Sequence, residues 1–308
     1  MRIAVMGTGG IGGYFGGRLA AAGHEVAFVA RGRQLEALKA NGLHVQSELG
    51  DLHLPTVEVT DDPSELAPAD VVLFGVKLWD TEESAALIKP LLAERTAVIS
   101  FQNGVVKDDV LRRIIGPEHV VGGVAYIAAT IAEPGVIKHT GTLQRLAFGE
   151  YDGSASDRVE AFRAACAEAG IDVAVSNEIE RTIWEKFVFL VGLSGLTTTT
   201  RTPVGEVRSN PRSRAFLRDV MDEAVQVARA QGVPIPAGFA DDRLAFVDQA
   251  PAEMTSSMHH DLNRGNRLEV AWLSGDVVDR GRNLGIPTPC NRAITDLLAV
   301  HADGSAGR

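Results

Sequence analysis

A single lysine lies in a largely apolar segment of the second half of the chain, where an ammonium group can act as an acid. Residues 183–190 read IWEKFVFL and include Lys186. A lysine in such a setting either extends its amine to water along its aliphatic stem or is held in place for a purpose. A positioned ammonium can donate a proton to a carbonyl oxygen as negative charge develops there. At helical spacing Lys186 forms one row with Leu190, Ser194 and Thr197, and Lys186 is a candidate functional residue on this row.

A glycine-rich turn near residue 7 has the spacing of a dinucleotide-binding motif. It matches G-x-G-x-x-G and lies between an apolar run at 3–6 and a helical pattern at 11–22. In this motif the first glycine makes a tight turn, the second lets the backbone approach a pyrophosphate, and the third allows close packing of helix on strand. The helix amino end supplies N–H donors to the phosphates. We therefore predict a dinucleotide site formed by Gly7, Thr8, Gly9, Gly10, Ile11 and Gly12.

The end of the second predicted strand, at 25–30, indicates which dinucleotide is bound. Chains that bind NAD place Asp or Glu there for the ribose 2′-hydroxyl, whereas an arginine accommodates the 2′-phosphate of NADP. This chain reads Ala30-Arg31-Gly32-Arg33, with no acidic residue at the strand end. Arg31 therefore predicts NADPH as the cofactor, the alternative being an ordinary surface arginine.

Two more polar segments follow predicted strands. Lys77 comes directly after the apolar run 70–76, and Gln102-Asn103-Gly104 follows the run 97–101. Ligands of open α/β sheets bind outside the carboxyl ends of the strands, so Lys77 and Asn103 lie where a ligand is expected. Asn-Gly is also an ordinary turn sequence, which is the alternative interpretation of Asn103.

The elements that must position these residues fall into two groups. Up to about residue 157, short apolar runs alternate with helical patterns, which is typical of a parallel sheet with crossover helices. The runs at 119–130, 136–139 and 144–149 have less helix between them and indicate an antiparallel edge. We predict an α/β Rossmann-type dinucleotide-binding domain over residues 1–176 and an all-α substrate and catalytic domain over 177–308. The helices expected beyond the sheet span 158–169, 179–196, 212–231, 241–249, 268–284 and 291–301, with a disordered tail after His301.

Composition excludes several classes of partner. The 308 residues carry a net charge of −10, whereas nucleic acid or an anionic membrane demands a basic surface. The two cysteines, Cys166 and Cys290, lie far apart, which predicts neither a disulfide framework nor a metal cluster and fits a reducing compartment. The first residues are interrupted by glycines too early for a membrane span or signal core. We expect a cytoplasmic protein with a small-molecule partner and no metal.

Together these residues resemble the ketopantoate reductase (2-dehydropantoate 2-reductase) family over nearly the whole chain. Besides the glycine motif and Arg31, the resemblance rests on Val76-Lys77, Gln102-Asn103-Gly104, Trp184-Glu185-Lys186, Ser256-Ser257-Met258-His259-His260-Asp261, Glu269 and Gly285-Ile286-Pro287-Thr288-Pro289.

The resemblance implies NADPH-dependent reduction of 2-ketopantoate to pantoate in pantothenate and coenzyme A biosynthesis. It implies that Lys186 is the general acid at the ketone oxygen and that Glu269 supports this lysine and the substrate. It also implies that Ser257 helps to hold the substrate, and that Lys77 and Asn103 lie at the nicotinamide and the substrate. From their residue types alone, Glu269 would be a solvated helix start and Ser257 a helix cap.

The chain departs from the family pattern along the helix of Lys186. Family members carry asparagines four and eight residues after this lysine, facing the substrate, whereas this chain has Leu190 and Ser194. Leu190 cannot hydrogen-bond a substrate hydroxyl, and a buried hydroxyl left unpaired typically costs about 1–3 kcal/mol. A 2-keto acid with a more apolar side chain therefore stays open as the substrate.

Two interpretations of another kind stay open as well. One is a related dehydrogenase of a 3-hydroxy acid or a sugar phosphate, which the combination of Ser257 and Glu269 disfavours. The other is a non-catalytic NADP-binding redox sensor, which needs Arg31 but has no use for an amine such as Lys186 beside the nicotinamide. A homodimer also stays open.

Overall fold

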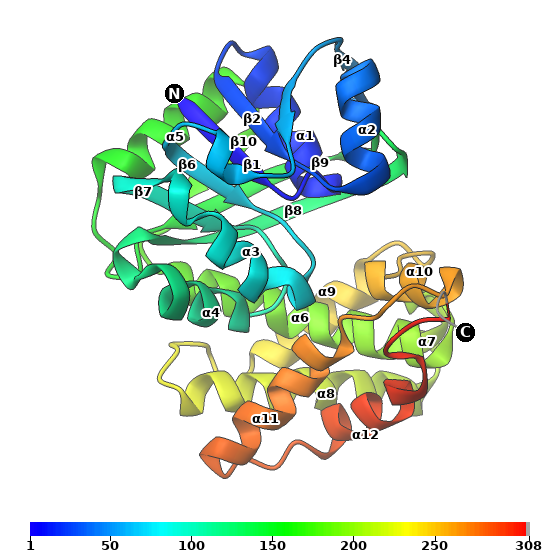
Figure 1. Ribbon diagram of the computed structural model, residues 1–308. Helices are drawn as coiled ribbons and strands as arrows, with labels where there is room; N and C mark the ends of the chain where they lie inside the picture. Colours follow the sequence, from blue (N-terminus) through cyan, green and yellow to red (C-terminus); the bar gives the residue numbers. More distant parts are fainter. Residues whose placement is uncertain (306–308) are drawn as a thin grey trace. The chain divides into compact units, whose positions relative to one another are not determined.

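The computed structural model describes residues 1–305, and the chain divides into two compact units (Figure 1). The first unit holds Met1–Asn103 and Lys107–Thr182. The second holds Gly104–Val106 and the chain from Ile183 onward. Among the described residues no helix is both long and apolar enough to cross a bilayer, and no three His, Cys, Asp or Glu side chains are grouped to hold a metal ion.

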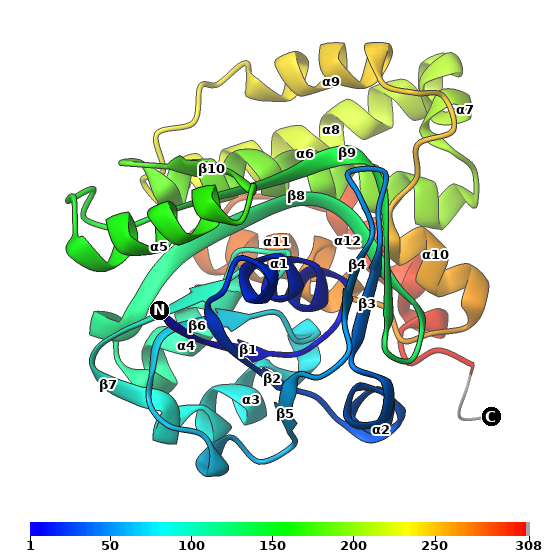
Figure 2. The same ribbon diagram turned by 90° about the horizontal axis from the view of Figure 1, so that it is seen from above.

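The first unit is built on one mixed sheet, which has ten strands within residues 1–305. In chain order they are β1 (Arg2–Met6), β2 (Glu25–Val29), β3 (Leu43–Gln46), β4 (Leu52–Leu54), β5 (Glu58–Thr60), β6 (Ala69–Phe74), β7 (Leu92–Ser100), β8 (Val120–Glu133), β9 (Val136–Gly149) and β10 (Asp172–Val175). The spatial order is β4-β3-β9-β8-β7-β6-β1-β2-β5, with β10 beside β9. β8 and β9 are antiparallel, and Figure 2 shows them running side by side along their length.

The centre of this sheet is parallel and its strands end together. β1 pairs in parallel with β2 and with β6, and Met6 is aligned with Val29 on one side and with Phe74 on the other. Phe74 is in turn aligned with Ser100 of β7. The loops that follow β1, β2, β6 and β7 therefore leave the sheet at one edge, which is the edge where open α/β sheets bind ligands.

Alternation along each strand explains why helices cover both faces. Successive side chains of a strand point to opposite faces, so the apolar run of β1 supplies two cores. Ile3 and Val5 pack in the core that includes α1 (Gly10–Ala21), α2 (Gly32–Asn41) and α5 (Asp157–Glu168). Ala4 and Met6 pack in the core that includes α3 (Thr81–Leu87) and α4 (Val106–Ile115). Short 3₁₀ turns at Pro63–Glu65, Leu78–Asp80, Lys89–Leu91 and Pro117–His119 complete the connections.

The second unit is helical. Its helices are α6 (Ile179–Thr200, which begins in the first unit), α7 (Val204–Ser209), α8 (Pro211–Ala230), α9 (Phe239–Gln249), α10 (Ser257–Arg264), α11 (Ser274–Leu284) and α12 (Pro289–Leu298), with 3₁₀ turns at Val270–Trp272 and Ala299–His301. α8 packs against α9, α11 and α12 (Figure 1). The carboxylate of Glu223 on α8 accepts hydrogen bonds from the backbone N–H groups of Cys290 and Asn291, at 2.7 and 2.9 Å, and so satisfies the amino end of α12.

The predicted fold class, a Rossmann-type α/β domain followed by helices, is confirmed, but three local predictions are wrong. The runs 136–139 and 144–149 are parts of one strand, β9, because a bulge around Gly141 absorbs the extra residues opposite β8. The helix predicted over 268–284 is broken at Leu273. Leu268 and Val270 are both buried although they would lie on opposite sides of a continuous helix.

The third wrong prediction concerns the carboxyl-terminal tail. Ala302 accepts a backbone hydrogen bond from Leu268 at 2.8 Å, and Ser305 donates one to Gly265 at 2.8 Å. Residues 302–305 are thus tied to the preceding loop rather than disordered, since their backbone polar groups find partners there. Residues 306–308 lie outside the described part of the chain.

Candidate active site

The turn between β1 and α1 has the geometry that its glycines predict. Gly7 has a φ of +95°, and a Cβ there would lie 2.8 Å from the backbone nitrogen of Val76, so both backbone and space require glycine. A Cβ at Gly12 would collide with the backbone oxygen of Gly7, so this position serves close packing of helix on strand. A Cβ at Gly9 would meet nothing within 4 Å. Protein packing therefore does not explain Gly9, whereas a ligand approaching the backbone would.

The amino end of α1 is suited to phosphate. Gly9 occupies the N-cap position and no side chain caps the helix, and its first turn has no acidic residue. Helix N–H groups that lack an internal partner, together with the helix dipole, favour an anion at such an end. Thr8 is buried and its hydroxyl donates to Val29 at 3.1 Å, so Thr8 shapes the turn through this bond. The residues present thus fit the pyrophosphate of a dinucleotide.

Arg31 lies at the carboxyl end of β2, as predicted, and is ion-paired. It is the N-cap residue of α2, and its side chain is 60% exposed. Its Nη2 lies 2.9 Å from Oδ2 of Asp80, which is itself 25% exposed. Asp80 follows β6 on the other side of β1 and precedes α3. The guanidinium expected to meet a 2′-phosphate therefore already has a carboxylate beside it, a relationship that the sequence did not reveal.

Lys77 and Asn103 emerge at this same edge. Lys77 is exposed, directly precedes the 3₁₀ turn Leu78–Asp80, and has its Nζ 5.5 Å from the centre of the Trp79 ring. Asn103 is half-buried and follows β7, before Gly104, whose φ of +84° makes the turn. The structure thus brings the glycine turn, Arg31, Lys77 and Asn103 to one edge of the sheet.

Gln102 ties the two loops of Lys77 and Asn103 together. Its buried Nε2 donates to the backbone oxygen of Val76 and to Oγ1 of Thr81, both at 2.9 Å. Its Oε1 accepts from Oγ of Ser100 at 3.0 Å. A buried amide with all of these bonds made is a rigid link. The sequence indicated a loop at Gln102 but not this role, because its partners lie up to 26 residues away in the chain.

A buried lysine forms hydrogen bonds to the end of β7. Lys107 is 1% exposed, and its Nζ donates to the backbone oxygens of Ser100 and Gly123 and to Oδ2 of Asp108. Asp108 also accepts from the hydroxyl of Tyr151 at 2.6 Å. Burial, followed by the negative charge of Asp108, raises the pKa of Tyr151, which keeps this phenol a donor. Lys107 thus acts on the strand end that carries Asn103 and does not resemble a solvated helix residue.

In the second unit, the row predicted from helical spacing lies on α6. Lys186 and Leu190 are half-buried, and Ser194 and Thr197 are buried. Thr197 donates to Leu193 at 2.7 Å, whereas Oγ of Ser194 has no hydrogen-bond partner among the described residues. An unpaired buried hydroxyl costs free energy and is an available site for a polar ligand atom.

Ser257 lies on a helix that is fastened to this row. Ser256, and not Ser257, is the N-cap of α10: its Oγ accepts from the N–H of His259 at 3.1 Å and lies 3.2 Å from Oγ1 of Thr197. Nδ1 of His259 lies 2.7 Å from the backbone oxygen of Thr197. Ser257 is exposed, so the capping role that its residue type suggested belongs to its neighbour.

Glu269 is buried rather than solvated. It is 8% exposed and lies directly before the 3₁₀ turn Val270–Trp272, without capping it. A buried carboxylate is costly unless it is paired or hydrogen-bonded, so burial sets Glu269 apart from an ordinary helix start. This favours the supporting role that the family resemblance implies for it.

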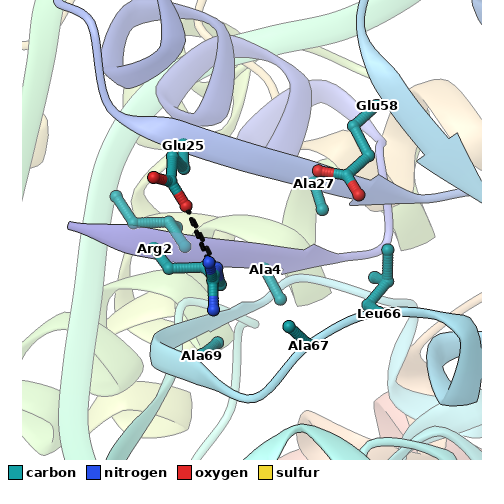
Figure 3. Close-up of a pocket in the computed structure, with 9 residues that line it drawn as sticks. Arg2, Ala4, Glu25, Ala27, Glu58, Leu66, Ala67 and Ala69 are labelled. Atoms are coloured by element: carbon teal, nitrogen blue, oxygen red, sulfur yellow. Dashed lines mark hydrogen bonds and ion pairs between the residues drawn. The ribbon is translucent and has the colours of Figure 1, made fainter.

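A hollow in the first unit lies away from these residues (Figure 3). It lies at the amino ends of the central strands, and its lining includes Glu58 and the ion pair, at 3.1 Å, between Arg2 and Glu25 of the adjacent strands β1 and β2. The glycine turn leaves the opposite ends of these strands. Because ligands of open α/β sheets bind at the carboxyl ends, this hollow is not the candidate site.

Comparison with known proteins bears on both units. The family model described as "Ketopantoate reductase PanE/ApbA" matches residues 3–153, and its partner model, "Ketopantoate reductase PanE/ApbA C terminal", matches residues 178–302. The chain belongs to the ketopantoate reductase family. It is therefore an oxidoreductase, and the family together with the geometry of the glycine turn gives it a nicotinamide dinucleotide as cofactor.

Individual relatives of this family align with nearly the whole chain. The 2-dehydropantoate 2-reductase of Archaeoglobus fulgidus is 34% identical, and the alignment covers 96% of each chain. Among solved structures, a ketopantoate reductase from Ralstonia eutropha has a TM-score of 0.89 at 36% identity, covering 98% of each chain. D-mandelate dehydrogenase with NADH and anilino(oxo)acetate, at 20% identity and a TM-score of 0.88, shares the fold.

Proposed function

We propose that this chain reduces a 2-keto acid to the 2-hydroxy acid with NADPH, and that the substrate is 2-ketopantoate, yielding pantoate for pantothenate and coenzyme A biosynthesis. The observation that carries the proposal is the half-buried Lys186 on α6 in a chain that aligns with a 2-dehydropantoate 2-reductase over 96% of its length. The proposal assigns cofactor binding to residues 1–176 and substrate chemistry to residues 177–308, in the cytoplasm, with a homodimer as an open assembly.

NADPH, when bound, supplies the hydride. The glycine turn over residues 7–12 would hold the pyrophosphate against the amino end of α1, and Arg31 would bind the 2′-phosphate by a charge-assisted contact. Lys77 and Asn103 are assigned to the nicotinamide end because they follow β6 and β7, the strands next in order from β1. Support for these roles comes from the shared edge of the sheet and from the space at Gly9.

Proton transfer is assigned to Lys186. As the carbonyl carbon gains a hydride, negative charge develops on its oxygen, and the ammonium of Lys186 neutralises it by giving up a proton. Glu269 would orient this lysine and the substrate, and Ser257 would donate to the substrate. Asn103 would contact both ligands. This division of roles follows the family pattern, and the burial of Glu269 supports it.

A second substrate is favoured by one specific observation. Where the family carries asparagines, this chain has Leu190, an apolar half-buried side chain, and Ser194, whose hydroxyl lacks a partner among residues 1–305. A 2-keto acid with a more apolar side chain would bury carbon against Leu190 without leaving a hydroxyl unpaired. Such a substrate keeps the fold and the reaction and changes the specificity alone.

One assay separates these proposals. Consumption of NADPH is followed with ketopantoate and with branched and aromatic 2-keto acids at equal concentration. Highest kcat/KM with ketopantoate supports the first proposal, and highest kcat/KM with an apolar keto acid supports the second. Binding of NADPH without turnover of any keto acid would contradict both and leave a redox sensor as the explanation.

A further inference from the structure

We infer that Asp80 is a specificity-determining residue. Through its ion pair with Arg31 it reduces the preference of this chain for NADPH over NADH. The inference rests on the proposed function, since it concerns how the same site distinguishes the two dinucleotides. Its basis is the 2.9 Å separation of Arg31 Nη2 and Asp80 Oδ2, two residues 49 positions apart in the sequence.

The position of the pair is set by the sheet. Arg31 follows β2 and Asp80 follows β6, and these strands flank β1, whose last residue leads into the glycine turn. The ribose of a dinucleotide held at that turn is read by the residue at the end of the second strand. Asp80 therefore brings a carboxylate to the guanidinium that would read the ribose, although no acidic residue follows β2 itself.

Asp80 directly precedes α3, where its carboxylate could cap the helix instead of pairing with Arg31. Aspartate is a favoured N-cap residue, whose carboxylate normally accepts from the N–H groups of the helix. Asp80 is the N-cap residue of α3 but makes no side-chain capping bond. Its carboxylate accepts a hydrogen bond from Arg31 instead, and so faces the residue expected to bind the cofactor ribose.

A carboxylate in this place has opposite effects on the two dinucleotides. A 2′-phosphate carries between one and two negative charges at neutral pH, and it would share Arg31 with Asp80 and lie close to a like charge. A 2′-hydroxyl can donate to Asp80, as it does to the acidic residue of chains that bind NAD. Asp80 thus weakens NADPH binding and strengthens NADH binding, while Arg31 does the reverse.

The test is direct titration of NADPH and of NADH into the purified protein by calorimetry, on the wild type and on Asp80→Asn. The variant keeps the shape of the side chain and an amide that is itself a good N-cap, so folding is preserved. We expect the ratio of the NADH to the NADPH dissociation constant to rise about tenfold. NADPH should bind more tightly and NADH more weakly, and each change should lie in the upper range for an exposed ion pair.

Asp157→Asn is the matched control. Asp157 forms an exposed ion pair with Arg95 at 3.0 Å in the same unit, so this variant removes one charge and one ion pair without touching Arg31. Its ratio should stay within about twofold of the wild type, as for other exposed pairs. Arg31→Ala should lower the ratio, because the phosphate loses its cation.

The outcomes separate the inference from the proposed function. An unchanged or lowered ratio in Asp80→Asn, with both dinucleotides still bound by the wild type, would overturn the inference and leave the reductase proposal intact. A wild type that binds neither dinucleotide would instead contradict the proposed function.

Discussion

Gln102 donates a hydrogen bond from Nε2 to the backbone oxygen of Val76 at 2.9 Å, and so joins the loop after β7 to the loop after β6. The same amide bonds Thr81 and Ser100. Asn103 and Lys77 each lie next to one end of this link. The loops that carry the two residues assigned to the nicotinamide end are therefore joined by one buried side chain.

Replacing Gln102 by leucine should destabilise the first unit. The apolar side chain has nearly the same volume but leaves the oxygen of Val76 and the hydroxyl of Thr81 without this donor, at a cost of about 1–3 kcal/mol in the free energy of unfolding. Urea denaturation measures it. Gln144→Leu is the control, because the hydrogen bond that Gln144 donates to the backbone oxygen of Gly170 is exposed. Equal losses in the two variants would contradict the positioning role of Gln102.

Replacement by alanine should affect NADPH binding at one glycine of the turn and the stability of the fold at another. Gly9→Ala should change the free energy of unfolding by less than about 1 kcal/mol, since its Cβ meets nothing within 4 Å. It should nevertheless weaken NADPH binding by at least about tenfold, because the added methyl group lies where the pyrophosphate is expected. Gly7→Ala should destabilise the fold itself, owing to its positive φ and the contact with Val76. Thermal unfolding and calorimetric titration measure the two effects. NADPH binding by Gly9→Ala at wild-type strength would rule out the pyrophosphate assignment.

Alkaline pH should destabilise the protein through Cys166. Burial raises the pKa of this thiol from 9.0 to about 12. The folded state therefore keeps a proton that the unfolded state releases, so stability is fully present below pH 9 and falls as the pH rises from 9 toward 12. Between about pH 8 and about pH 10, this thiol should remove about 1.4 kcal/mol from the free energy of unfolding.

Cys166→Ala should lack that component. Cys290 remains in both proteins, so its own titration cancels in the difference between them. Urea denaturation at the two pH values gives the measurement. Parallel pH dependences for the wild type and Cys166→Ala would show that Cys166 does not cause the loss.

Leu190→Asn tests the substrate side of the site. If Leu190 has adapted the chain to an apolar keto acid, asparagine should raise kcat/KM for ketopantoate by about tenfold, the equivalent of one recovered hydrogen bond to a buried hydroxyl. It should lower kcat/KM for the apolar substrate. The ratio of the two kcat/KM values is the measurement, and NADPH affinity serves as the control. No change in the ratio would exclude contact between residue 190 and the substrate side chain.

The sequence alone predicted those parts of the fold and site that depend on local patterns. The glycine turn, the strand before it and the row from Lys186 to Thr197 follow from spacing, and the structure has them where predicted. The pairing of Arg31 with Asp80 could not be predicted, because it depends on β2 and β6 flanking β1, and strand order has no local signal.

Burial of charge was missed for a related reason. Lys107 precedes two acidic residues and has the sequence of a solvated helix start, yet its amine is enclosed by backbone oxygens of β7 and β8. Only the pairing of these strands creates that enclosure. Residue type alone likewise places Glu269 at a solvated helix start, whereas it is buried and precedes the 3₁₀ turn Val270–Trp272 rather than a continuous helix.

The most direct test of the proposed mechanism is the turnover number of Lys186→Ala with the best 2-keto acid of the panel. If Lys186 donates the proton, kcat should fall by at least about 100-fold, the lower range for loss of general acid catalysis. The dissociation constant for NADPH should stay close to that of the wild type, because the proposed cofactor residues lie in the first unit. A variant that binds NADPH normally and keeps a near wild-type kcat would contradict the mechanism and direct the search for the proton donor to Lys77.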